Sequence, residues 1–305
     1  MFGDFSGICA RTSLPLCTLV SPLHDFNTSF PGILPDCYAR TVDVSNTLIF
    51  QIGTAFIHIS SLIVTLMIIY NVRLRYTSVG RKEMLVFYWS FILFTISSII
   101  VDTGVAPAGS TTYGYFVSFQ VAMTGVCCWT LFFAGLSSLN FWDDGSVHTM
   151  AALFVTSFAV FTLNYVVSLL TFENWTNLIN RAETTSLFVL YFIVNGTLLF
   201  MYLVCQLFIC FVTLVLNWWA IGALCFSVFF FVAAECLLYI FNYSICTSLN
   251  HYVDGLIFST LSNLFAIMLV YKYWDIITFD DDEYIRYTEI VQGVGYKEET
   301  QALLS

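Results

Sequence analysis

Seven long apolar stretches constrain the fold of this chain more than any other feature of its sequence. An α-helix needs about 20 mostly apolar residues to cross the hydrocarbon core of a bilayer. Stretches of that length occupy residues 47–70, 84–105, 113–139, 148–170, 186–212, 218–240 and 253–273. Of the 305 residues, 59% are hydrophobic and 10% are charged, a balance that is typical of a chain embedded in lipid. The sequence therefore predicts an all-α, multi-pass membrane protein with seven transmembrane helices.

The remaining segments divide the chain into three expected parts. Residues 1–46 form a cysteine-containing N-terminal segment, 47–273 the transmembrane domain, and 274–305 an acidic, flexible tail. The net charge of −10 does not indicate nucleic-acid binding, because acidic residues gather in that tail, as in many solvated segments. A basic start followed by an apolar core is missing from residues 1–20, so the first stretch is expected to act as the insertion signal.

Basic residues predict the orientation of these helices. Four of the ten Lys and Arg residues lie between the first two stretches: Arg73, Arg75, Arg81 and Lys82. Positively charged loops beside a spanning helix stay in the cytosol. With this loop cytosolic, seven basic residues fall on the cytosolic side and three on the lumenal side. We therefore expect a lumenal N-terminus and a cytosolic C-terminus.

Cysteines and glycosylation motifs agree with this orientation. Four cysteines lie outside the stretches, all on the predicted lumenal side: Cys9, Cys17, Cys37 and Cys246. An even number in an oxidising compartment favours two disulfides, and three pairings remain possible. The other six cysteines are expected to be packing residues without a metal, since His is missing at ligand spacing. Of three lumenal N-x-[ST] acceptors, only Asn27 is expected to carry a glycan, because Asn174 and Asn242 lie too near the membrane.

Polar residues recur at helical spacing inside three of the stretches. They are Gln51, Thr54, His58, Ser61 and Thr65 in the first; Thr95, Ser98 and Asp102 in the second; and Asn195, Tyr202, Gln206 and Thr213 in the fifth. Unpartnered polar groups are costly in hydrocarbon, so these stripes are expected to face other helices. Their role is open between interhelical hydrogen bonding, a polar cavity and a partner-binding face.

Three carboxylates in or beside the stretches are candidate partner or structural residues. Glu235 lies within an apolar run, where a charged carboxylate costs about 2.5–3.5 kcal/mol, so it is expected to be protonated or paired. A proton relay is the functional alternative. Asp102 and Asp254 lie near predicted lumenal helix ends, where hydration lowers their cost, and Asp102 precedes a turn containing Gly104 and Pro107.

Motifs of the common membrane enzymes are missing from the sequence. H-E-x-x-H and G-x-S-x-G do not occur, the four histidines are scattered, and D-x-D occurs only in the acidic tail. All five prolines lie outside the stretches, unlike the broken helices of many transporters. We predict a binding protein without enzymatic activity or cofactor. The alternatives are a seven-helix transporter, a receptor, or a lipid-handling membrane enzyme that uses Glu235 and Asp254.

The tail contains short patterns typical of sorting signals. Asp281 and Glu283 match a di-acidic export pattern, and Glu299, Leu303 and Leu304 match an acidic dileucine pattern. On a cytosolic tail, such patterns would be recognised by vesicle coat proteins.

Longer motifs carry a resemblance to a known family. They include Cys37-Tyr38-Ala39-Arg40, Gly80-Arg81-Lys82-Glu83, Val101-Asp102-Thr103-Gly104-Val105, Trp142-Asp143-Asp144-Gly145, His251-Tyr252-Val253-Asp254-Gly255-Leu256 and Val270-Tyr271-Lys272-Tyr273-Trp274-Asp275. Through these motifs the chain resembles the fungal chitin synthase export chaperone family nearly end to end. One departure concerns Glu235, where the family pattern more often has Gln.

The resemblance implies a multi-pass protein of the endoplasmic reticulum membrane. It would bind a chitin synthase catalytic subunit, support its folding and export, and so support cell-wall chitin synthesis. It would also contact membrane lipids and travel onward to the plasma membrane with its partner. Arg81, Glu83 and His251 lie in the shared motifs and are candidates for partner contact or structure. We hypothesise that the polar stripes cover polar transmembrane surfaces of the synthase and that the lumenal segment holds its lumenal loops.

Overall fold

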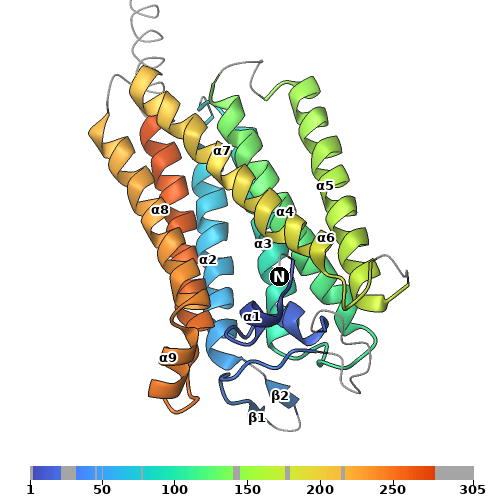
Figure 1. Cartoon of the computed structure of the whole chain (residues 1–305). Helices are drawn as coiled ribbons and strands as arrows, with labels where there is room; N and C mark the ends of the chain where they lie inside the picture. Colours follow the sequence, from blue (N-terminus) through green and yellow to red (C-terminus); the bar gives the residue numbers. More distant parts are fainter. Residues whose placement is uncertain are drawn as a thin grey trace, which may run out of the picture.

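A computed structural model describes residues 3–21, 32–44, 47–49, 51–76, 78–139, 145–175, 179–213 and 217–278. Seven of its helices are long and apolar enough to cross a membrane, which confirms the predicted all-α fold (Figure 1). They are α2 (Ile52–Leu74), α3 (Arg81–Asp102), α4 (Tyr113–Ser137), α5 (Val147–Glu173), a fifth span over Thr185–Phe211, α8 (Trp218–Tyr239) and a C-terminal helix (Gly255–Thr278).

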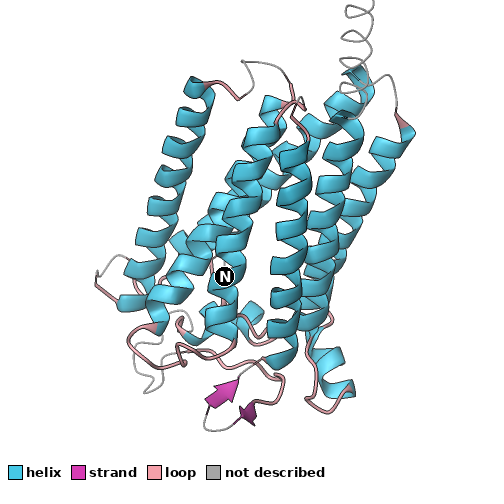
Figure 2. Ribbon diagram, turned by 180° about the vertical axis from the view of Figure 1, so that it is seen from behind, coloured by secondary structure: helices cyan, strands magenta, loops and turns pink. Residues whose placement is uncertain are grey.

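The first and last spans begin and end later than the sequence predicts. Strand β1 (Val42–Val44) pairs antiparallel with β2 (Thr47–Ile49), with Val42 opposite Ile49, so α2 starts only at Ile52. These strands are rich in β-branched residues, which favour extended backbone. The hairpin lies at one end of the bundle (Figure 2). At the other end, the C-terminal helix continues to Thr278.

The fifth span is not a regular α-helix. It consists of α6 (Thr185–Phe188), the π-helical segment η2 (Val189–Val194), α7 (Asn195–Phe208) and a second π-helical segment, η3 (Ile209–Thr213). The sequence predicted one uninterrupted helix here, because the apolar run gives no sign of where a wider turn begins. Wider turns of this kind occur frequently at functional sites.

Helix α4 forms the centre of the bundle. It packs against α3, α5 and α7. Within an apolar 18-residue segment of α4, 67% of the residues are buried inside the protein, compared with 11% in the corresponding segment of the fifth span. Two glycines allow the close approach. A Cβ on Gly125 would lie 2.8 Å from Asn164 Nδ2 on α5, and a Cβ on Gly135 would lie 2.7 Å from the ring of Tyr202 on α7.

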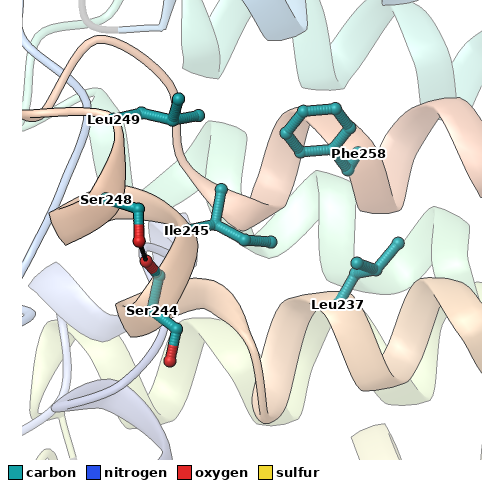
Figure 3. Close-up of a pocket in the computed structure, with 6 residues that line it drawn as sticks. All are labelled: Leu237, Ser244, Ile245, Ser248, Leu249 and Phe258. Atoms are coloured by element: carbon teal, nitrogen blue, oxygen red, sulfur yellow. Dashed lines mark hydrogen bonds between the residues drawn. The ribbon is translucent and has the colours of Figure 1, made fainter.

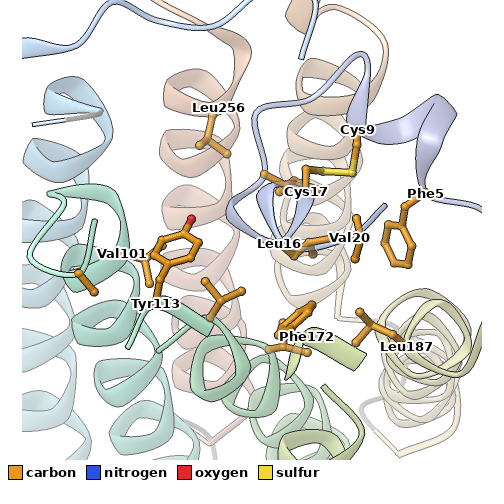
Figure 4. Packing of buried hydrophobic residues seen from close by; sticks show 14 of the residues in the cluster. Phe5, Cys9, Leu16, Cys17, Val20, Val101, Tyr113, Phe172, Leu187 and Leu256 are labelled. Carbon is orange, nitrogen blue, oxygen red and sulfur yellow. A yellow bond between two sulfur atoms is a disulfide. The ribbon is translucent and has the colours of Figure 1, made fainter. Parts of the chain in front are cut away.

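The N-terminal residues fold into the open end of the bundle. We call residues 3–21, 32–44 and 47–49 the N-terminal cap and this end of the bundle the cap end. The cap contains α1 (Ser6–Cys9) and the 3-10 helix η1 (Pro15–Thr18). Its buried side chains Phe5, Leu16 and Val20 pack against residues from several spans, among them Val101, Tyr113, Phe172, Leu187 and Leu256 (Figure 4). The end where Thr278 lies is the tail end.

Two disulfides hold the cap in place. Cys9 pairs with Cys17 inside the cap, with Cα atoms 5.4 Å apart. Cys37 pairs with Cys246, with Cα atoms 6.0 Å apart, and this bond joins the cap to α9 (Asn242–Ser248). The structure thus selects one of the three pairings that the sequence left open.

We expect loss of the Cys37–Cys246 bond to destabilise the protein more than loss of the Cys9–Cys17 bond. Their sequence separations are 209 and 8, and a longer closed loop restricts the unfolded chain more strongly. Replacing both Cys37 and Cys246 by Ser should lower the free energy of unfolding in detergent by about 2–5 kcal/mol. The matched control is the Cys9→Ser, Cys17→Ser variant. An equal or greater loss in that control would contradict the expectation.

Candidate functional site

One cavity of about 660 Å³ lies inside the bundle, between α2, α3, α4, the fifth span, α8 and the C-terminal helix. Its polar lining residues are Thr54, His58, Ser61, Thr95, Ser98, Asp102, Gln120, Thr124, Asn195, Ser227, Glu235, Ser259, Thr260 and Asn263. Seven residues of the predicted stripes are among these, and an eighth, Tyr202, lines the cavity as well, so these eight face other helices as expected. The predicted stripes did not include Gln120, Thr124, Ser227, Ser259, Thr260 and Asn263, although 120 and 124 are spaced one helical turn apart. Cap residues Leu14, Pro15 and Leu16 line the cavity as well.

A buried contact between a histidine and a carboxyl group joins α2 and α3 in this cavity. His58 Nε2 lies 3.1 Å from Asp102 Oδ2, and the side chains are 11% and 5% exposed. The expectation that water hydrates Asp102 at its helix end is therefore wrong: the carboxylate is buried and paired with His58. The sequence did not predict this pair. If α2 and α3 extend equally far from the loop that joins them, the number of residues in each places Asp102 roughly one helical turn farther from the loop than His58.

Glu235 extends from α8 into the same cavity. Its carboxylate has no hydrogen bond or ion pair with any residue that the structure describes. The phenols of Tyr191 and Tyr239 and the thiol of Cys128 lie within electrostatic range of it. The sequence predicted that Glu235 is either protonated or paired with another group. The described part of the chain provides no such pairing partner. Asp102, the other carboxylate of the cavity, is engaged with His58.

Asp254 is part of the connection between the cap and the C-terminal helix. Its side chain is fully buried, and its Oδ2 accepts a hydrogen bond from Ser13 Oγ at 2.8 Å. Burial raises the pKa of the Asp254 carboxyl, although this hydrogen bond acts in the opposite direction. The next residue, Gly255, must be small, because a Cβ there would lie 2.5 Å from the Leu237 carbonyl oxygen.

Asn242 makes a second connection between the cap and the helices. Its Nδ2 donates to the Arg11 carbonyl at 2.7 Å, and its Oδ1 accepts from the Gly255 amide at 2.6 Å. With 1% exposure, its side chain is not accessible for glycosylation, which agrees with the sequence expectation. Asn27 lies outside the described residues.

His251 joins two of the shared sequence motifs. Its Nδ1 lies 3.2 Å from the Tyr38 carbonyl oxygen and 3.3 Å from Cys37 Sγ, and its own carbonyl accepts from the Arg40 amide at 2.8 Å. Cys37, Cys246 and His251 form the only described group close enough to hold a metal. The two sulfur atoms are bonded to each other, so the group does not provide a metal ligand set.

At the tail end, the Gly80–Glu83 motif holds the turn before α5. Glu83 is fully buried, and its Oε1 accepts from the Gly145 amide at 3.1 Å. Lys82 Nζ donates to the Gly145 carbonyl at 2.6 Å. The Arg81 guanidinium lies over the ring of Tyr76, 5.6 Å from its centroid. In this structure the contacts of Glu83 are therefore internal to the fold, and its buried side chain is not part of the outer surface.

The basic loop is also joined to the C-terminal helix. Arg75 forms an ion pair with Asp275, which also accepts from Lys272 Nζ at 2.9 Å. Trp274 Nε1 donates to the Val79 carbonyl at 3.1 Å. These contacts give both Arg75 and the motif ending at Asp275 a packing role.

A smaller, shallow hollow lies at the cap end between α8, α9 and the C-terminal helix. It is lined by Leu237, Ser244, Ile245, Ser248, Leu249 and Phe258 (Figure 3). The Ser248 hydroxyl donates to the Ser244 carbonyl at 2.7 Å, so this polar group is used within α9. The central cavity, with its carboxylates and amides, is the stronger candidate for a ligand site.

Breaking the His58–Asp102 pair from one side is expected to destabilise the bundle. His58→Ala leaves a buried carboxylate without its partner, which costs about 3–5 kcal/mol in other proteins. Ser60→Ala is the matched control, because Ser60 lies on the exposed face of the same helix and, within the described part of the chain, bonds only to the Phe56 carbonyl. The Ser60→Ala substitution should change the free energy of unfolding by no more than about 0.5 kcal/mol. Denaturant unfolding in detergent measures both, and similar values for the two variants would refute the role of the pair.

Comparison with known proteins places the chain in a family. The family model described as "Chitin synthase export chaperone" matches residues 1–285. Curated proteins of that name are 44% identical in Candida albicans and 40% identical in Saccharomyces cerevisiae. The alignments cover 93% of this chain in both cases, and 91% and 94% of the two relatives. A relative of the same name from Kluyveromyces lactis is 43% identical over 93% of this chain and 94% of its own length. The family consists of chaperones rather than enzymes, and this chain belongs to the chitin synthase export chaperone family.

Proposed function

We propose that this chain binds a chitin synthase catalytic subunit in the endoplasmic reticulum membrane and supports its folding and export. The observation that carries the proposal is the 40–44% identity, over 93% of the chain, to proteins named chitin synthase export chaperones. The cap end would face the lumen and the tail end the cytosol. The two disulfides at the cap end and the basic loop at the tail end support this orientation.

The N-terminal cap offers a surface suited to the partner's lumenal loops. Leu34, Tyr38 and Tyr252 are 77%, 53% and 71% exposed. The Arg40 guanidinium lies 5.1 Å from the centroid of the Tyr252 ring. Tyrosine and arginine side chains contribute strongly to binding energy in protein interfaces. We call Tyr38, Arg40 and Tyr252 the cap surface.

The cap surface is held rigid before a partner arrives. The Cys37–Cys246 bond lies directly beside it, and His251 contacts the backbone of both Tyr38 and Arg40. A preformed surface loses less conformational entropy on binding, which favours affinity. Membership of a chaperone family and this rigid surface together support a role in holding an unassembled subunit.

The polar stripes are not suited to the role hypothesised from sequence. Eight of their twelve residues line the internal cavity, so these residues do not form an outer surface that could cover polar groups of the synthase. The enzyme alternative is also weakened, because Asp254 is occupied by Ser13 and fully buried. Nothing in the fold or in the family favours a transporter or a receptor.

The tail sorting motifs remain predictions. Asp281, Glu283, Glu299, Leu303 and Leu304 lie outside the described residues. We propose that vesicle coat proteins recognise them and that the chain accompanies its partner toward the plasma membrane.

Removing the two aromatic rings of the cap surface should weaken partner binding. We expect Tyr38→Ala combined with Tyr252→Ala to reduce co-purification of the catalytic subunit in mild detergent at least about ten-fold, since each ring is of a type that carries binding energy. Trp175→Ala is the control, because Trp175 is 60% exposed beyond the end of α5. Unchanged co-purification in the double variant, with both variants folded, would rule out this surface.

The function itself is tested by deleting the protein from a fungal cell. The catalytic subunit should then accumulate in the endoplasmic reticulum, and re-expression of the chain should restore its export. Imaging of a tagged catalytic subunit measures both. Normal export in the deletion strain would refute the proposed function.

A further inference from the structure

The central cavity reaches the membrane-facing surface between the fifth span and α8. Phe200 on α7 and Phe231 on α8 both line the cavity and are also exposed, at 62% and 37%. Near the tail end, Cys210, Ala220 and Leu224 close the space between these helices. Toward the cap end, α7 and α8 diverge (Figure 1). A ligand could therefore enter this cavity from the bilayer.

Glu235 lies near the cap-side end of α8, the end of a spanning helix at which lipid head groups are expected to meet the acyl chains. It is about one helical turn from the end of α8 at Tyr239. Its carboxylate has no partner among the described residues, and an unpaired carboxylate is costly in hydrocarbon. Tyr191, Phe192 and Tyr239 line the cavity with it. Aromatic rings beside a carboxylate form a favourable environment for an organic ammonium group.

The rest of the cavity fits an acyl chain. From Glu235 toward the tail end, the lining face of α8 continues through Phe231, Val228 and Leu224. The rise from Glu235 to Leu224 is about 16 Å, close to the roughly 15 Å thickness of half a hydrocarbon core. A volume of about 660 Å³ is too small for a helix and lies within the range of small-molecule sites.

We propose that the cavity binds a phospholipid with an ammonium head group, taken from the leaflet at the cap end. One acyl chain lies along α8 between Phe231 and Leu224, and the ammonium group lies against the Glu235 carboxylate. The hydroxyl groups of Tyr191 and Tyr239 are placed to donate to the lipid phosphate. The lipid completes the interior of the bundle, and its binding does not depend on the synthase.

Native mass spectrometry of the purified full-length chain in mild detergent tests the head-group contact. The probes are phosphatidylethanolamine and phosphatidylglycerol with identical acyl chains. We expect one phosphatidylethanolamine per chain, bound about ten-fold more tightly than phosphatidylglycerol. Glu235→Gln should abolish this preference, whereas Glu183→Gln, at an exposed position near the cap end, should keep it.

A glycine pair tests the acyl-chain path. A Cβ on Gly196 of α7 or Gly222 of α8 would meet no described atom within 4 Å, but only Gly196 lines the cavity. Gly196→Leu should therefore weaken binding of both lipids, while Gly222→Leu should bind them as the native chain does. Absence of a head-group preference in the native chain, or an unchanged preference in Glu235→Gln, would overturn the proposal. So would a Glu235→Gln variant that loses the catalytic subunit but keeps the lipid preference, because the carboxylate would then serve the partner.

Discussion

The need to satisfy polar groups inside a membrane determines how this protein is built. Lipid offers them no hydrogen bonds, so the polar stripes of the helices turn inward and meet in one cavity. The His58–Asp102 pair joins two helices in that interior, and removing His58 would leave the buried Asp102 side chain without this partner. Because the polar groups are used inside, the faces of the spans that contact lipid are largely apolar. This arrangement is consistent with the proposal that a partner is recognised mainly by residues outside the bilayer.

The N-terminal cap links that interior to the outside. Its residues Leu14 to Leu16 line the cavity, while Tyr38 and Arg40 lie on its outer surface. The Cys37–Cys246 disulfide and the hydrogen bonds of Ser13 and Arg11 hold the cap against the helix ends. We therefore expect a structural change in the cavity to shift the surface that is proposed to bind the synthase. An oxidising compartment suits such a design, because the Cys37–Cys246 bond fixes the part of the cap that carries Tyr38.

The sequence predicted the parts of this structure that depend on composition and helical spacing. Seven spans, the inward stripes and the four disulfide cysteines all follow from where apolar, polar and thiol side chains occur. The His58–Asp102 pair did not follow, because residue counting does not fix the relative height of two helices. Nor did the π-helical turns of η2 and η3, since an apolar run looks the same with and without a wider turn. The sequence did not predict the burial of Glu83, because its hydrogen-bond partner, Gly145, lies in a loop 62 residues away in the sequence.

We propose that the cap, and not the surface of the spans, recognises the synthase. A photoreactive amino acid at position 252, next to Arg40, tests this in native membranes. The same group at Phe158, which is 68% exposed on α5, serves as the comparison. The account predicts a crosslink from position 252 to a lumenal loop of the catalytic subunit and little from position 158. A crosslink from position 158 to the synthase, with none from position 252, would contradict it.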